Sequence, residues 1–147
     1  MVAFRDPWEV ASSLEPRGID PETGLDLWST YVRETLRSLG TVPARRVLVL
    51  GYRTLITEPE RWVRTATRFL RDLGIGVTRE TISASRAVVD RELYRNRDLP
   101  GGPQTELGIR ARELYDFLMS HEGSLGTGEV AALRDLPEWT AAVDQGT

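Results

Sequence analysis

The chain turns from an apolar run into the start of a helix within two residues, and this junction constrains its fold more than any other feature. Residues 1–5 are mostly apolar and predict a short buried strand. Asp6 can accept hydrogen bonds from the first free amides of a helix over residues 7–14. Pro7 suits the first helical position, because its φ is fixed near the helical value and its missing N–H costs nothing there. The fold must therefore place a helix N-terminus directly at the end of a strand.

Arg5 lies at this junction, and its neighbours favour an anion. Glu9, three residues after Asp6, completes an Asp-x-x-Glu variant of the capping box. A guanidinium beside free backbone amides and the positive end of a helix dipole makes a site for a phosphate-like group. An ordinary strand-to-helix turn with a solvated arginine fits the same residues.

Residues 47–50 predict a second strand, because they form a continuous apolar, β-branched-rich run bounded by basic residues and Gly51. Such a run is typical of a strand buried on both faces of a parallel sheet. Asp20-Pro21 predicts another helix start, and Gly40 suits the position just after the end of that helix. Trp28 and Tyr31 follow its helical spacing, so we expect both rings in the core.

Further helices are expected along the rest of the chain. Thr57 and Glu60 predict a capping box, and the helix that follows runs to Leu73. Its exposed face carries arginines, which fit a solvated face or a polyanion site. The remaining expected elements are a short helix over 79–88, a loop over 98–104, a helix over 105–120 and a short helix over 129–135. Two strands with five or six surrounding helices make an α/β domain.

Composition narrows the class of protein. The 147 residues are 40% hydrophobic and include no cysteine, which leaves no disulfide, thiol nucleophile or zinc–thiolate site. Residues 1–100 hold 16 arginines against 14 acidic residues, and residues 101–147 hold 3 against 8. A nucleic-acid binder usually has a strong basic excess, so we expect no nucleic-acid partner. No apolar run reaches the length of a membrane span, and no signal-peptide pattern is present, so the cytoplasm is the expected location.

Arg5 and Ser13 are eight residues apart, and this spacing resembles the 3′-phosphate motif of sulfotransferases that use 3′-phosphoadenosine 5′-phosphosulfate (PAPS). The resemblance covers roughly residues 1–120 and continues in the same order through several short segments. These are Leu27-Trp28-Ser29-Thr30-Tyr31, the strand ending at Tyr52, Glu58-Pro59-Glu60, Phe69-Leu70-Arg71-Asp72-Leu73-Gly74, the basic segment Val89 to Arg97, and Ala111-Arg112-Glu113-Leu114-Tyr115.

The resemblance implies a partial P-loop-like sulfotransferase fold with two short parallel strands. It implies that Arg5 and Ser13 hold the 3′-phosphate of PAPS or of its desulfated product PAP, that Tyr52 contacts the adenine, and that Arg95 and Arg97 fold back over the phosphate. The Glu-Asp that usually follows the tyrosine is here Arg53-Thr54. PAPS is the implied co-substrate, no metal is implied, and the acceptor hydroxyl or amine stays open.

The family's 5′-phosphosulfate loop and its strand precede the arginine motif and do not occur in this chain, which also contains no lysine. We therefore expect residues 1–122 to be the C-terminal part of a sulfotransferase-like domain, truncated and without activity alone, and 123–147 to be a tail. No catalytic residue can be named: the one histidine, His121, fits the end of a helix better than a general base.

Two further expectations follow. A sheet with a missing neighbour exposes an unpaired edge, so the isolated chain should form a homodimer, pair with a missing N-terminal half, or aggregate. The alternative to a nucleotide-binding protein is a non-catalytic helical interaction module that binds an acidic partner through the arginine-rich helix face.

Overall fold

A short mixed sheet forms the centre of the computed structural model, which describes residues 1–78, 102 and 104–124. Strand β1 (Val2–Phe4) pairs in parallel with β2 (Leu48–Gly51), and β3 (Gly123–Ser124) pairs antiparallel with β2. The order is β1-β2-β3. The two expected parallel strands are confirmed. The two-residue strand β3 was not predicted from the sequence.

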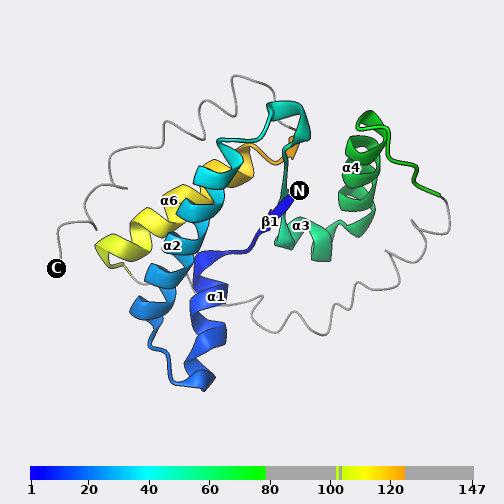
Figure 1. Ribbon diagram of the computed structural model, residues 1–147. Helices are drawn as coiled ribbons and strands as arrows, with labels where there is room; N and C mark the ends of the chain where they lie inside the picture. The colour runs from blue at the N-terminus through cyan, green and yellow to red at the C-terminus, as the bar shows by residue number, and fades with distance from the viewer. Residues whose placement is uncertain (79–101, 103, 125–147) are drawn as a thin grey trace.

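Five α-helices of the described residues surround this sheet (Figure 1). They are α1 (Pro7–Leu14), α2 (Pro21–Leu39), α3 (Tyr52–Thr57), α4 (Pro59–Asp72) and α6 (Glu106–Ser120). Short 3₁₀ turns occur at Glu15–Arg17 and Ala44–Arg46. The chain is thus a mixed α/β protein in which helix predominates over strand.

The core has two parts because β2 is buried on both faces. Val47 and Val49 pack into a cluster with residues of α1, α2 and α6, whereas Leu48 and Leu50 pack against Ala66 and Phe69 of α4. Figure 1 accordingly shows α4 on one side of the sheet and α1, α2 and α6 on the other. The sequence prediction of a fully buried parallel strand is confirmed, and the burial of these side chains is the main stabilising term for the sheet.

The helix starts at Asp6 and Asp20 are also confirmed. Asp6 Oδ1 accepts hydrogen bonds from the amides of Trp8 (2.8 Å) and Glu9 (3.2 Å), and Asp20 Oδ1 accepts one from Thr23 N (3.0 Å). Proline occupies the first turn of both helices. Capping by aspartate followed by proline therefore fixes where α1 and α2 begin.

The capping box at Thr57 and Glu60 was wrong. Thr57 ends α3 instead, and its hydroxyl donates to the carbonyl of Arg53 (2.9 Å). The N-cap of α4 is Glu58, which makes no side-chain capping bond, and Pro59 follows it. Thr57 belongs to α3, a short helix that the sequence did not predict, and its hydroxyl is bonded within α3 and does not cap α4.

One of the expectations for α2 was wrong. Tyr31 is 71% exposed, although Trp28 is 5% exposed as expected. A step of three residues turns a side chain by about 60° around a helix, which moves Tyr31 past the buried stripe of α2. Gly40 directly follows the end of α2, as the sequence predicted, but its φ of −56° is not the left-handed conformation that favours glycine.

The helices expected over 79–88 and 129–135, like Arg95 and Arg97, fall outside the described residues. Among the described helices none is long and apolar enough to cross a membrane.

Candidate functional site

The sheet register brings Arg5 and Tyr52 together. Phe4 of β1 lies opposite Gly51 of β2, and the next residue of each strand is Arg5 or Tyr52. Because β1 and β2 run in parallel, both side chains leave the same edge of the sheet, formed by the carboxyl ends of the strands. This edge is where α/β proteins commonly bind ligands.

The Arg5 guanidinium lies over the Tyr52 ring, with its carbon 5.0 Å from the ring centroid. A cation within about 6 Å of an aromatic face is attracted by the ring quadrupole. The structure thus brings together two of the residues that the sequence assigned to one nucleotide site. Both come from positions that the strand pairing fixes.

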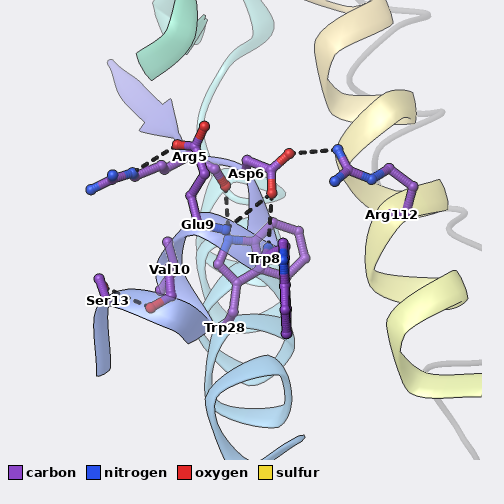
Figure 2. A network of polar contacts seen from close by, with 8 residues as sticks. All are labelled: Arg5, Asp6, Trp8, Glu9, Val10, Ser13, Trp28 and Arg112. Carbon is purple, nitrogen blue, oxygen red and sulfur yellow. Dashed lines mark hydrogen bonds and ion pairs between the residues drawn. The ribbon is translucent and has the colours of Figure 1, made fainter. Parts of the chain in front are cut away.

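Glu9 and Trp28 help to hold Arg5 in place (Figure 2). Its Nε donates to Glu9 Oε2 at 3.0 Å, which forms an ion pair between residues four apart. Its backbone carbonyl accepts a hydrogen bond from Trp28 Nε1 at 3.0 Å. The buried Trp28 ring of α2 therefore anchors the main chain, and Glu9 of α1 orients the guanidinium.

Asp6 occupies the N-terminus of α1, and this corrects one part of the expected anion site. The sequence predicted free amides at this helix start, but the Asp6 carboxylate already accepts from two of them. The other oxygen of Asp6 accepts from Arg112 Nη1 of α6 at 2.5 Å. The amides at this end of α1 thus have an internal anion, and recognition of an external phosphate falls to side chains.

Ser13 shares a face of α1 with Glu9, because residues four apart in a helix lie one above the other. Figure 2 shows Arg5 and Ser13 on one side of α1 and Arg112 on the other. The Ser13 hydroxyl is exposed and donates to the carbonyl of Val10 at 2.7 Å. It needs only a rotation about χ1 to donate to a ligand instead. Glu9 contacts Arg5, and Ser13 follows Glu9 by one helical turn.

Arg5 also lines a groove of about 280 Å³ between β1, α1 and α2. Most of the wall is apolar and includes Val10, Leu14, Leu27 and Tyr31. The exposed side chains of Leu27 and Tyr31 both line this groove. A ligand with an anionic group at Arg5 can therefore rest an apolar part beside it.

Tyr115 of α6 lies behind the site and belongs to the same electrostatic cluster. Burial, with a smaller contribution from the charges of Asp6 and Glu9, raises its pKa to about 12, and the charges of Arg53 and Arg112 oppose this shift. Its ring meets Trp28 edge to face at 6.5 Å, and the Arg112 guanidinium lies 5.7 Å from its centroid. Tyr115 therefore stays neutral at physiological pH and serves as packing beneath the charged residues.

Glu122 stabilises the end of β2 from the other side. Its Oε1 accepts from the amide of Gly51 at 2.7 Å, and its Oε2 lies 3.7 Å from Arg61 Nη2. A Cβ at Gly51 would lie 2.9 Å from Met119 Sδ and 3.1 Å from Glu122 Oε1, so a larger residue would displace these side chains. Glu122 thereby fixes the residue directly before Tyr52.

Sequence reasoning missed Glu122 and Arg112 as supporting residues. Arg112 is 106 positions from Asp6, and Glu122 is 71 positions from Gly51, so neither pairing has a local pattern. Glu9 was assigned only to helix capping. A glutamate four residues after an arginine was the signal for the Arg5–Glu9 pair.

His121 follows the last residue of α6, as the sequence predicted. Its Nδ1 lies 2.9 Å from the carbonyl of Phe117, and its ring packs 4.5 Å from the Phe117 ring, centroid to centroid. A ring nitrogen that donates to a backbone carbonyl satisfies the end of the helix. This arrangement gives His121 a structural role in α6.

The arginine face of α4 is partly neutralised by its own acids. Arg61 pairs with Glu58 at 3.3 Å, and Arg64 pairs with Glu60 at 3.6 Å. Within the described residues no group of three or more histidine, aspartate or glutamate side chains could hold a metal ion. The junction around Arg5 is therefore the candidate site that the geometry favours.

Comparison with protein-family models, with curated proteins and with solved structures found no match to this chain in any of the three.

Proposed function

We propose that this protein binds a nucleotide that carries a 3′-phosphate, PAPS or PAP, in the manner of the sulfotransferases that its motifs resemble. The observation that carries the proposal is the Arg5 guanidinium held over the Tyr52 ring at the carboxyl ends of two adjacent parallel strands. An arginine recognises phosphate through parallel hydrogen bonds, and a tyrosine face suits an adenine ring.

Each residue of the proposed site has a distinct role. The Nη groups of Arg5 donate to the 3′-phosphate, while Glu9 keeps Nε. Ser13 turns its hydroxyl from the Val10 carbonyl to a phosphate oxygen. Tyr52 contacts the adenine, and the apolar groove beside Arg5 accepts the remainder of the nucleoside. Arg95 and Arg97 remain proposed phosphate contacts by resemblance alone.

The proposal concerns nucleotide binding and assigns no catalytic residue. Sulfuryl transfer requires in-line geometry and stabilisation of charge on the transferred group and on the leaving oxygen. A binding site for the 3′-phosphate lies at the far end of the nucleotide from that chemistry, so its contribution is to position the co-substrate. Transfer to an acceptor hydroxyl or amine is the reaction class that this site fits.

The test is a thermal-shift titration with PAP on the wild type and on Arg5→Ala. A ligand that binds only the folded state at 100 times its Kd stabilises it by about 2.7 kcal/mol, which raises the midpoint by several degrees. Arg45→Ala is the matched control, because Arg45 is an exposed arginine outside the site. We expect a shift in the wild type and the control, and none in Arg5→Ala.

The proposal is rejected if a folded wild type shows no shift with PAP, or if Arg5→Ala shifts as much as the wild type. The unliganded midpoint of each variant is measured first, so a loss of stability is not taken for a loss of binding.

A further inference from the structure

We infer that Glu9 is a built-in competitor for the nucleotide phosphate, and that binding requires the phosphate to share or replace its contact with Arg5. This inference rests on the proposed function and adds a residue that sets the affinity of the site. It follows from the position, the burial and the charge of Glu9.

The Arg5–Glu9 pair is formed in advance by the helix. Glu9 lies in the first turn of α1, four residues after Arg5, so its carboxylate reaches Nε without any change of the backbone. The side chain of Glu9 is 10% exposed, and that of Arg5 is 28% exposed. The carboxylate is thus the buried partner, and the guanidinium faces outward. An anion in solution competes with a partner that is always adjacent.

Two ion pairs join described residues at this junction, Arg5 with Glu9 and Asp6 with Arg112. Two guanidinium groups face two carboxylates, so an incoming phosphate dianion meets no net positive charge from these pairs. A buried like charge beside a ligand anion opposes binding more strongly than an exposed one, because water screens it less.

Glu9 is in direct contact with the guanidinium that would bind the phosphate. Its carboxylate accepts from Arg5 Nε at 3.0 Å, and Ser13 follows one helical turn later on α1. A phosphate bound by the Nη groups of Arg5 therefore lies close to the Glu9 carboxylate, because the same guanidinium contacts both. Removing this one negative charge, while keeping the shape of the side chain, should strengthen the site.

The variant Glu9→Gln does this, because glutamine has the same size and its amide oxygen still accepts from Arg5 Nε. We expect PAP to bind Glu9→Gln at least about tenfold more tightly than the wild type, which corresponds to about 1.4 kcal/mol. Glu9→Ala removes the charge but also the contact that orients Arg5, so it should gain less affinity than Glu9→Gln does. Glu15→Gln is the matched control, since Glu15 is an exposed acid directly after α1, and it should bind as the wild type does.

Each variant is titrated with PAP and, separately, with inorganic phosphate by isothermal titration calorimetry. If the wild type binds PAP and both Glu9→Gln and Glu9→Ala bind it no more tightly than the wild type does, the competitor role is overturned and the proposed function remains intact. A gain for inorganic phosphate without any PAP binding supports the competitor role and rejects the nucleotide site. No response of any folded variant to either ligand overturns both.

Discussion

Replacing Asp6 with alanine should destabilise the protein more than the loss of an ordinary helix cap does. Asp6 caps α1 through the amides of Trp8 and Glu9, and it also receives a hydrogen bond from Arg112 of α6. One carboxylate therefore joins the start of α1 to a helix more than a hundred residues away. The substitution removes both interactions at once.

The two contributions can be estimated separately. Loss of an N-cap costs about 1 kcal/mol of the free energy of unfolding. The Asp6–Arg112 ion pair is partly exposed, with side chains 14% and 39% accessible, so solvent screening limits it to about 1 kcal/mol. Asp6→Ala should thus lower the free energy of unfolding by about 2 kcal/mol.

Urea denaturation of a double-mutant cycle measures this coupling. Asp6→Ala, Arg112→Met and the double variant are compared with the wild type, since methionine keeps an unbranched side chain near the Tyr115 ring without the charge. We expect a coupling free energy of about 1 kcal/mol between the two sites.

Asp20→Ala serves as the control for Asp6→Ala. Asp20 caps α2 by accepting hydrogen bonds from the amide and the hydroxyl of Thr23, both within the first turn of the same helix. Asp20→Ala should lower the free energy of unfolding by less than Asp6→Ala does. If the two substitutions cost the same and the coupling energy is near zero, the Asp6–Arg112 bond does not join α1 to α6 in solution.

Three further outcomes are expected. Gly51→Ala should lower the urea midpoint, with a cost of about 1–3 kcal/mol, because its Cβ would lie 2.9 Å from a side-chain atom, whereas Gly76→Ala meets nothing within 4 Å and should be neutral. Trp28→Phe leaves the Arg5 carbonyl without its donor, which should cost about 1–3 kcal/mol in denaturation and weaken PAP binding. The raised pKa of Tyr115, about 12, adds stability that is fully present below pH 10 and is lost as pH rises through 12; Tyr115→Phe should flatten this decline in denaturation curves.

The sequence predicted well those helices and strands that are marked by residues next to one another in the chain. Asp6 and Asp20 each precede a proline. An aspartate followed by a proline indicates where a helix begins, whatever the rest of the fold. The run at residues 47–50 is apolar throughout, which only a strand buried on both faces tolerates at that length. The same run is typical of a parallel sheet, which the family resemblance also implied.

The elements that were missed depend on the tertiary arrangement. Trp28 and Tyr31 have the same spacing signal, and only the packing of α2 against α1 and α6 decides which of them is buried. Thr57 has the residue type of an N-cap, but α3 extends far enough to use its hydroxyl internally. The spacing of apolar residues shows that a segment is helical, but it does not show which side of the helix packs against its neighbours.

The candidate site divides in the same way. Arg5 and Tyr52 could be placed together because each follows a strand, and parallel strands end at one edge of a sheet. The supports from Trp28 and Arg112 could not, because they cross 23 and 106 residues of chain. The residues proposed to contact a ligand could be predicted from motifs, whereas the residues that hold them in place depend on the packed fold.

The central claim is that Arg5 recognises a 3′-phosphate, and the most direct measurement compares two nucleotides that differ in that group. Calorimetric titration of the wild type and Arg5→Ala with PAP and with adenosine 5′-monophosphate gives the contribution of the 3′-phosphate in each protein. We predict that the wild type prefers PAP by about tenfold or more, and that Arg5→Ala loses this preference. Equal affinity of the wild type for the two nucleotides, or an unchanged preference in Arg5→Ala, would contradict the account.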